Sequence, residues 1–411
     1  MNRLGVVIIG SNGAVATTVM AGVALMRKGL APRHGMLTET DMKEKLGLTS
    51  TDNFVFGGWD LRADNAYEAA LHHGVLQKHV LDQVKEELEQ FKPWPAVASE
   101  KFLKSWAGKN FVPAKNHREE LSILESNLKD FKSKNDLQRV VMVNLTSTEK
   151  YIEIEDVHQS IEAFEAGLDK NDARISPAMK YLYVAIKNGI PHANFTPSLA
   201  TNVPALEKLA EKHKVPMAGD DGKTGQTLVK TVLAPMFNVR QLHVAGWYST
   251  NILGNNDGLV LNDPESNKTK VESKKSVLDD ILGYKVEDHQ VHIHYYKPRG
   301  DAKEAWDNID IVGFAGEPMQ LKVNFLCKDS ILAAPIVVDL VRLLDAAKQK
   351  GEAGIQRQMG LFFKNPSHSV GERPQHDLFK QRDVLEKWID KVSATSDKTD
   401  KSDKRTLAAV G

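Results

Sequence analysis

Short apolar runs alternate with longer segments of helical periodicity through the first half of the chain. The continuous apolar runs, which indicate buried strands, occupy residues 6–9, 53–56, 140–144 and 215–218. Helical patterns occupy residues 15–28, 64–90, 177–188 and 203–213. Strands that are apolar on both faces and are separated by helices are typical of a parallel sheet covered on both sides. The polar segment 91–135, which carries several lysines, is interpreted as an insertion on this sheet domain.

Beyond about residue 240 the pattern changes. Apolar and polar residues alternate at 291–296, 309–312 and 321–327, which predicts an antiparallel sheet with one covered face. Helical periodicity returns at 336–350 and 378–392, and a polar segment follows. We therefore predict an α/β fold, a doubly wound parallel sheet interrupted by a smaller α+β domain. The predicted parts are the sheet domain at 1–245, the inserted domain at 246–330, the return to the sheet domain at 331–392 and a mobile tail at 393–411.

Composition narrows the classes of function. Lysine and arginine total 54 and aspartate and glutamate total 54, so the formal net charge is zero. A dedicated nucleic-acid binder usually carries a basic excess, so we expect no nucleic-acid partner. The apolar runs are far shorter than the roughly 18 residues of a membrane span, so we expect a cytoplasmic protein with no membrane partner. The single cysteine, Cys327, excludes an intramolecular disulfide and a multi-cysteine metal site, and we interpret it as a small core residue.

The first candidate for chemistry is a glycine turn between the first strand and the first helix. Backbone N–H groups at such a turn, together with the helix N-terminus, bind the diphosphate of a dinucleotide. The spacing departs from G-x-G-x-x-G because Asn12 stands in place of the middle glycine, so a plain strand–helix turn is the alternative. The candidate cofactor-binding residues are Gly10, Ser11, Asn12, Gly13, Ala14 and Val15.

An acidic residue that could bind ribose hydroxyls is expected about 20 positions after the glycine turn. None is evident there, and the next candidate is Asp60, at the end of the second predicted strand. A turn aspartate that only shapes the backbone is the alternative interpretation.

A second loop, at residues 219–227, precedes a predicted helix. Gly222, Lys223 and Thr224 imitate the end of a Walker A loop, but that loop needs a glycine at position 217, which is Met217. A loop of small residues at a helix N-terminus still suits an anion. Asp220 and Asp221 could instead cap the helix.

Further polar groups follow in the predicted inserted domain. The turn-rich segment 251–258 offers Asn and Asp oxygens to a sugar or a cation, with a simple turn as the alternative. Lys270 and Lys274 are four residues apart, and Lys303 follows a predicted strand. Lysines that converge on one pocket would bind phosphate and lower one another's pKa, whereas a solvated surface is the usual alternative. His292 and His294 share a strand face, which is a weak metal signal.

Taken in order, these segments resemble the myo-inositol-1-phosphate synthase (inositol-3-phosphate synthase) family. Each motif is weak alone, but the ordered set is specific and spans most of residues 5 to 385. The matching segments are Gly10–Ala16, Gly58–Asp60, Asn144–Glu149, Gly219–Thr227, Leu253–Gly258, Ser276–Asp280, Lys297–Lys303 and Cys327–Pro335.

The resemblance implies a Rossmann domain that holds NAD, an inserted α+β catalytic and oligomerisation domain, and a homotetramer. It implies the isomerising cyclisation of glucose 6-phosphate to inositol phosphate, which feeds inositol and phospholipid biosynthesis. In that chemistry C5 is oxidised, C6 enolises and attacks C1, and the hydride returns, so NAD is a true catalyst. A divalent or monovalent cation is a further expected cofactor, with its ligands unknown.

The resemblance also implies roles for individual residues. Lys270 and Lys380 are expected to transfer protons and stabilise oxyanions near C5, and Lys274 and Lys303 to contact the phosphate and the enolate. The remaining expected catalytic residues are Asp221 and Asp257. Substrate binding is expected from Thr224, Gly225, Gln226, Asn251 and Asn256. Further cofactor-binding or lysine-orienting residues are expected to be Asp60, Thr146, Asp301, Asp329 and Ser330.

The chain departs from the family pattern at Asn12, Ala16, Gly222 and Thr224. Two alternatives to the synthase stay open. One is a net NAD-dependent dehydrogenase of a sugar phosphate, and the other is a non-catalytic nucleotide-binding relative.

Overall fold

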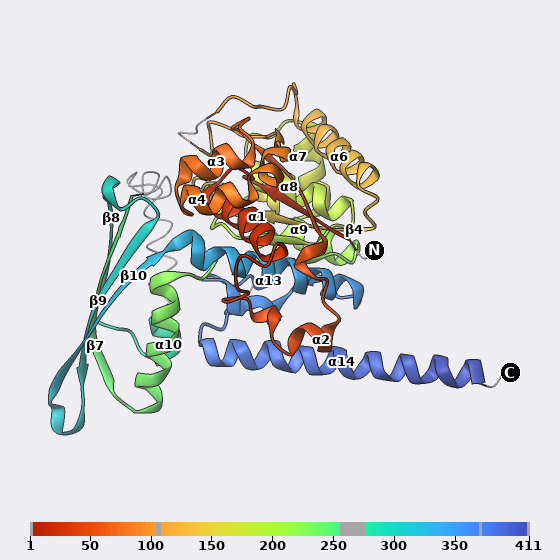
Figure 1. Ribbon diagram of the computed structural model, residues 1–411. Coiled ribbons are helices and arrows are strands. Elements are labelled where there is room, and N and C mark those ends of the chain that lie inside the picture. Colours follow the sequence, from red (N-terminus) through yellow and green to blue (C-terminus); the bar gives the residue numbers. More distant parts are fainter. Residues whose placement is uncertain (1–2, 104–107, 255–276, 370–371, 409–411) are drawn as a thin grey trace.

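The computed structural model describes residues 3–103, 108–254, 277–369 and 372–408. This part of the chain contains two sheets (Figure 1). A seven-stranded parallel sheet has helices on both faces, and a four-stranded sheet projects from this larger domain. The order of the large sheet is β11-β6-β5-β4-β1-β2-β3. Its strands are β1 (Leu4–Ile9), β2 (Phe54–Asp60), β3 (Trp94–Pro95), β4 (Arg139–Asn144), β5 (His192–Asn194), β6 (Pro216–Ala218) and β11 (Gly354–Ile355).

The direction of winding reverses between β1 and β4. These two strands pair in parallel, with Leu4 opposite Arg139 and Ile9 opposite Asn144. In open α/β sheets, ligands bind beyond the carboxyl ends of the strands at such a reversal. The prediction of a doubly wound parallel sheet is confirmed.

Helices cover both faces of the large sheet. One face packs on α6 (His117–Lys134), α7 (Ile161–Asp169), α8 (Pro177–Lys187) and α9 (Pro204–Lys212). The other packs on α1 (Ala14–Arg27), α2 (Met42–Leu46), α13 (Asp329–Gln349) and α14 (Leu378–Ala408). The strands are therefore buried on both sides, as their unbroken apolar sequences predict.

Two local predictions for the large domain are wrong. Segment 91–135 is more than an insertion, because Leu121, Leu124, Leu128 and Phe131 on one side of α6 belong to the main core. Segment 64–90 is broken into α3 (Ala66–His73), α4 (Lys78–Leu81) and α5 (Lys85–Gln90). Gly74 ends α3 in the left-handed conformation, at φ 62°, a conformation that glycine adopts without a steric penalty.

The small sheet has the order β10-β9-β7-β8. Its strands are β7 (His243–Leu253), β8 (Asp288–Tyr295), β9 (Ala302–Val312) and β10 (Pro318–Lys328). The sheet was predicted to be antiparallel, but β8 runs parallel to β7. The segment between these two strands, 254–287, is long enough for the crossover that parallel pairing requires.

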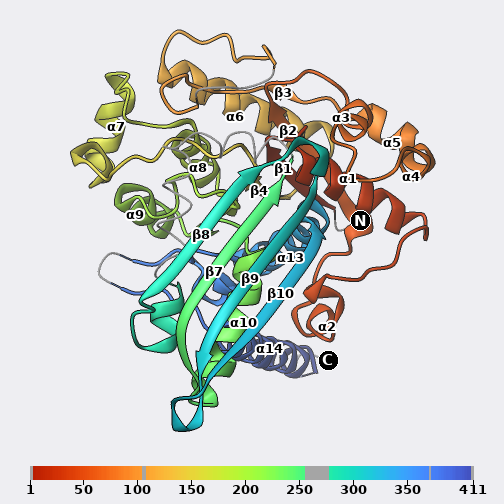
Figure 2. The same ribbon diagram turned by 90° about the vertical axis from the view of Figure 1, so that its left-hand side faces the viewer.

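One face of the small sheet packs on α10 (Gly225–Val239) and on residues 277–282. The sequence pattern assigned α10 to the large domain, but its Ala234 and Phe237 pack against Trp247 and Ile309 of the small sheet. In Figure 2 the opposite face of the sheet lies toward the viewer with α10 behind it.

Segment 393–411 was predicted to be a mobile tail, and α14 runs through it as far as Ala408. Its residues up to 408 include no glycine and no proline, the two residues that most disfavour a helix. No described helix combines the length and apolarity that crossing a membrane requires.

Candidate active site

The glycine turn lies at the carboxyl end of β1, at the reversal of the sheet. Gly10 has φ +80°, and a Cβ there would lie 2.9 Å from the carbonyl oxygen of Leu145. The N–H groups of Gly10 and Ser11 both donate to the carbonyl of Trp59 on β2. Gly13 is the N-cap of α1, and no side chain caps this helix. The first N–H groups of α1 are therefore available to an anion.

Asn12, which replaces a glycine of the usual motif, ties the turn to the loop after β2. Its backbone N–H donates to Asp60 Oδ2 over 2.8 Å, and its Nδ2 donates to the carbonyl oxygens of Arg62 and Asp64. Asp60 Oδ1 accepts from the Arg62 N–H over 2.8 Å. Burial raises the pKa of Asp60, and the N–H donors oppose that rise. The carboxylate is thus fixed at the end of β2, beside the turn.

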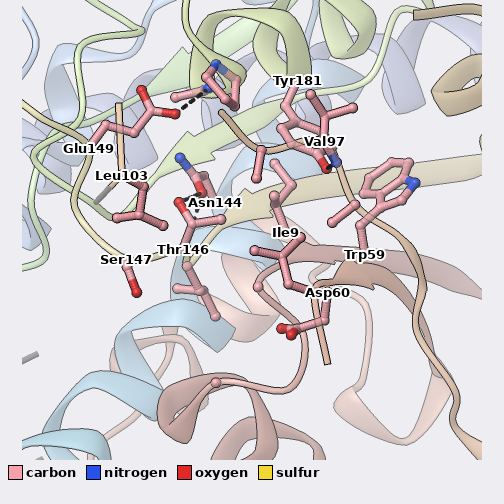
Figure 3. A pocket seen from close by; sticks show the side chains of 18 of the residues that line it. Ile9, Trp59, Asp60, Val97, Leu103, Asn144, Thr146, Ser147, Glu149 and Tyr181 are labelled. Carbon is pink, nitrogen blue, oxygen red and sulfur yellow. Dashed lines mark hydrogen bonds between the residues drawn. The ribbon is translucent and has the colours of Figure 1, made fainter. Parts of the chain in front are cut away.

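A cavity of about 380 Å³ opens beyond this edge of the sheet (Figure 3). The ring of Trp59 packs against Tyr181 at 5.2 Å, and the Tyr181 hydroxyl accepts from the Val97 N–H. In this view Glu149 lies at the upper left of the labelled side chains and Asp60 at their lower edge. We call this the first cavity. Residues from four strand ends line it, including Gly10, Gly13, Asp60, Arg62, Val97, Asn144, Thr146, Glu149 and Tyr181.

Glu149 is a buried acid in the wall of the first cavity. Its Oε1 accepts from the N–H of Ala178, in the first turn of α8, over 2.9 Å. Desolvation raises the pKa of Glu149 to about 7, against the opposing effect of its hydrogen bonds. Asn144, at the end of β4, accepts from both the N–H and the hydroxyl of Thr146 and so fixes the next part of the wall.

A second cavity of about 220 Å³ lies beside the first, where the two sheets meet. The N-termini of α10 and α13 converge there: Thr224 Oγ1 donates to Asp329 Oδ1 over 2.8 Å. Lys303, at the start of β9, has its Nζ 3.5 Å from the same carboxylate oxygen. Lys364 also lines this cavity, and its Nζ donates to Asp221 Oδ1 over 2.8 Å. Two lysines, each paired with an aspartate, thus lie beside the N-terminus of α10, which no side chain caps, and an anionic ligand could share their charge.

Neighbouring residues hold the N-terminus of α13. The Asp301 carboxylate accepts from the backbone N–H of Ser330 and, over 2.8 Å, from its hydroxyl. Cys327, on β10, faces Lys303 in register and is buried, and this burial raises the pKa of its thiol to about 11. The interpretation of Cys327 as a core residue agrees with this placement.

A fully buried aspartate fixes the start of α10 from the small sheet. Asp307 Oδ1 accepts from Trp247 Nε1 at 2.7 Å, from Ser249 Oγ at 2.6 Å and from Gln226 Nε2 at 3.1 Å. The Gln226 carbonyl oxygen in turn accepts from Asn251 Nδ2. The side chain of Gln226, which was expected to contact a phosphate, is therefore occupied within the protein. Only its backbone N–H, in the first turn of α10, remains for a ligand.

A family model described as myo-inositol-1-phosphate synthase matches residues 4–390. The chain belongs to this family. The reaction of the myo-inositol-1-phosphate synthase family is the NAD-dependent isomerising cyclisation of glucose 6-phosphate to inositol 3-phosphate.

Relatives and solved structures agree. Inositol-3-phosphate synthase 1 of Bacteroides thetaiotaomicron is 46% identical over 398 residues, which cover 92% of this chain and 93% of the relative. The rice protein of the same name is 30% identical over 379 residues, or 84% and 74% of the two chains. The crystal structure of inositol-3-phosphate synthase from Caenorhabditis elegans superposes with a TM-score of 0.89 at 24% identity and covers 95% of this chain and 86% of that one. A myo-inositol-1-phosphate synthase-related protein from Thermotoga maritima gives 0.77 at 24% identity, over 94% and 98%. These structures support the fold.

The residues of the first cavity fit the NAD of the myo-inositol-1-phosphate synthase family. The Ser11 hydroxyl and the side-chain amide oxygen of Asn12, Oδ1, are buried at the glycine turn and have no hydrogen-bond partner in the described structure. The uncapped N-terminus of α1 suits the diphosphate, and Asp60 suits the ribose hydroxyls.

The structure brings together most, but not all, of the residues that the family resemblance implies. The first cavity includes Gly10, Asn12, Gly13, Asp60 and Thr146. The second includes Ala14, Val15, Asp221, Thr224, Lys303, Asp329 and Ser330. Asn251 and Asp301 lie behind it in the hydrogen-bond networks described above. Lys270, Lys274, Asn256 and Asp257 lie outside the described residues.

Lys380 is the exception among the described lysines. It lies in the first turn of α14 with 66% of its side chain exposed, and it does not line either cavity. The next residue, Gln381, does reach the loop at 219–227, because its Oε1 accepts from the buried Nζ of Lys223 at 2.5 Å. Lys380 is thus next in sequence to a residue that contacts the loop at 219–227, but its own side chain is exposed to solvent.

Four acidic or basic residues of the two cavities were missed from the sequence: Arg62, His73, Glu149 and Lys364. Only Glu149 carried a signal, since it follows β4 within a segment that matches the family. Lys364 lies between Phe363 and Asn365, with no local pattern that marks it as a site residue.

Proposed function

We propose that the chain converts D-glucose 6-phosphate to 1D-myo-inositol 3-phosphate, with the adenosine half of NAD in the first cavity and its nicotinamide half beside the sugar phosphate in the second. The observation that carries this proposal is the second cavity, where Lys303 and Lys364 lie beside the N-terminus of α10 and the dinucleotide site. When bound, NAD supplies reversible acceptance of the hydride from sugar C5.

The lysines of the chain act on protons and oxygens. A carbonyl at C5 acidifies the protons at C6, and an ammonium group beside the C5 oxygen stabilises the enolate that forms. We assign this role to Lys303, whose carboxylate partner Asp329 fixes it at the wall of the cavity. Lys270 and Lys274 are proposed to complete the cluster. Lys380 is proposed to join this cluster when its exposed side chain turns over the loop at 219–227, which Gln381 contacts.

The phosphate group is proposed to bind at the N-terminus of α10. Thr224 and Gly225 start this helix, and Gly225 at φ +51° approaches Lys303, whose Nζ lies 3.7 Å from where a Cβ would stand. Backbone N–H groups at 224–226 and the Lys303 ammonium would then share the charge of the phosphate.

Product analysis tests this function. The protein is incubated with glucose 6-phosphate and a catalytic amount of NAD, the products are followed by NMR, and NADH is followed by absorbance. We expect inositol phosphate without accumulation of NADH. Stoichiometric NADH without a cyclised product would establish the net dehydrogenase instead, and NAD binding without any turnover would establish the non-catalytic relative.

We also propose a homotetramer that uses the open face of the small sheet (Figure 2). Tyr248 and Trp306 are exposed on this face with their rings 6.1 Å apart, and the parallel rings of His292 and His294 continue the row. Exposed aromatic rows of this kind favour self-association. Analytical ultracentrifugation of the native chain should give a tetramer, and Trp306→Lys should give smaller species. A monomer at micromolar concentration would refute this assembly.

Two minor assignments complete the proposal. The activity is placed in the cytoplasm, where the sugar phosphate would be available. An activating cation, divalent or monovalent, is also proposed, without assigned ligands. Turnover after chelation, and after addition of Mg²⁺ or NH₄⁺, tests the cation.

A further inference from the structure

The two cavities share a short section of wall. Five residues line both of them, namely Gly13, His73, Leu145, Thr146 and Ser147. If the adenosine half of NAD lies beside Asp60 and its nicotinamide half beside Lys303, the diphosphate must cross this section. The inference that follows therefore rests on the proposed function.

His73 is the only one of these five shared residues whose side chain can carry a positive charge. The other four offer an apolar side chain, hydroxyl groups and the N-cap of α1. Arg62 is also near, but its guanidinium donates twice to Asp64 Oδ2, at 2.9 and 2.7 Å. Among the residues shared by both cavities, a diphosphate at this junction thus meets one basic side chain, His73, which becomes cationic only by taking up a proton.

A hydrogen bond fixes the tautomer of His73. Its Nε2 lies 2.7 Å from the carbonyl oxygen of Asn12, and a carbonyl can only accept, so Nε2 carries the proton. In the neutral ring Nδ1 is then an unprotonated acceptor, which repels an anion. In the imidazolium ring Nδ1 becomes a second donor.

The charges around His73 set the balance between these two forms. Burial lowers the pKa of His73, and the cationic groups His72, on the same helix, and Arg62, after β2, lower it further, whereas the bond to the Asn12 carbonyl opposes them. Asp60 and Asp64 lie on the loop that Asn12 holds, and Lys328 of β10 donates to the Val75 carbonyl near the end of α3. A dianionic diphosphate adds negative charge at the junction and so favours the protonated ring.

We propose that His73 is a cofactor-binding residue, which holds the glycine turn through Nε2 and takes up a proton at Nδ1 to bind the diphosphate of NAD. In this arrangement the His73 ring bonds the glycine turn with one nitrogen and the charged diphosphate with the other. The proton comes from solvent and returns to it when the cofactor leaves.

Calorimetric titrations with NAD, ADP-ribose and adenosine test this proposal without the sugar reaction. Because His73 faces the diphosphate, we expect His73→Ala to weaken NAD and ADP-ribose about 10-fold and to leave adenosine unchanged. His79→Ala is the control: it removes an exposed histidine of α4 that lines neither cavity, and all three affinities should be retained.

A second variant separates the turn from the charge. His73→Gln keeps a donor for the Asn12 carbonyl but cannot take up a proton. Titrations in buffers of different ionisation enthalpy should show proton uptake on NAD binding by the native chain and none by His73→Gln.

Three results would overturn the proposal. They are unchanged NAD affinity in His73→Ala, an equal loss for NAD, ADP-ribose and adenosine, and equal proton uptake by the native chain and His73→Gln. The second result would mean that His73 only supports the turn. If the native chain bound no NAD at all, the proposed function would fail as well, which a defect limited to the His73 variants does not imply.

Discussion

The two sheets present ligand sites by different means. The large parallel sheet offers the first cavity mainly backbone groups: the glycine turn, the N-terminus of α1 and the strand ends of β1, β2 and β4. The small mixed sheet offers the second cavity side-chain charge, with Lys303 on β9 and Asp329 directly after β10. Backbone groups can bind a cofactor that stays in place, whereas side chains can exchange protons with a changing substrate. If this division holds, changes in one sheet should affect one property and leave the other intact.

The largest effect is expected from the small sheet. Lys303→Ala should lower kcat about 1000-fold, because it removes the ammonium group proposed to stabilise the enolate. The Kd for NAD should change little, because the proposed adenosine and diphosphate contacts lie in the first cavity and at the junction, which Lys303 does not line. Steady-state kinetics and calorimetry measure the two quantities. The control is Lys208→Ala on α9, an exposed lysine outside both cavities, which should retain activity. Loss of NAD binding in Lys303→Ala would break the division.

The next effect concerns stability. Asp307→Ala should lower the free energy of unfolding by about 3 kcal/mol, because three buried donors lose their acceptor. Urea unfolding followed by circular dichroism measures this change. Asp310→Ala, on the same strand with an exposed carboxylate, should change stability by less than about 0.5 kcal/mol. Equal effects of the two substitutions would show that the buried network contributes little.

The third effect belongs to the large sheet. Asp60→Ala should weaken NAD about 30-fold, because the carboxylate that Asn12 and Arg62 hold in place would no longer accept the ribose hydroxyls. At saturating NAD the kcat should be nearly native. Asp52→Ala, before the opposite end of β2, is the control and should leave the Kd unchanged. A large loss of kcat in saturating NAD would place Asp60 in the chemistry as well.

The smallest effect is a change in pH dependence within the core of the large sheet. His192 on β5 is fully buried, both of its ring nitrogens have no hydrogen-bond partner in the described structure, and burial lowers its pKa to about 3. A lowered histidine pKa means that stability is full above pH 6.5 and falls as the pH drops toward 3. The free energy of unfolding of His192→Leu, measured relative to that of the native chain, should therefore rise by about 1 kcal/mol as the pH falls from 7 to 5.5.

Thermal or urea unfolding at the two pH values measures this difference. His79→Leu, which replaces an exposed histidine on α4, is the control. A stability difference between His192→Leu and the native chain that stays constant with pH would contradict the assignment.

The pattern of the sequence was sufficient for the large sheet, because its strands are short apolar runs and its cofactor turn is local. The strands from β1 to β6, except for the short β3 and β5, and the position of the glycine turn follow from that pattern. The role of Asn12 did not, since its partners Arg62 and Asp64 lie 50 and 52 residues away. Periodicity also did not show β7, whose residues at 243–253 mix exposed and buried positions around Gly246.

The candidate site was less accessible to sequence reasoning, because it depends on long-range pairing of charges. Gln226 looks like a ligand contact from its neighbours, but Asp307, 81 residues away, accepts its amide. Lys364 lines the second cavity and is paired with Asp221, 143 residues earlier, whereas Lys380 is exposed although the resemblance implies that it belongs to the site. Which lysines share a pocket is decided by these contacts, and spacing along the chain does not contain them.

The bond between Thr224 and Asp329 has a consequence for the history of the fold. Thr224 begins the helix that leads out to the small sheet, and Asp329 begins the helix that follows the last strand of that sheet. The whole excursion of about a hundred residues therefore starts and ends at two side chains in contact. A loop closed at its base in this way can be lengthened, shortened or exchanged between relatives while the residues at its base, which form the wall of the second cavity, keep their places.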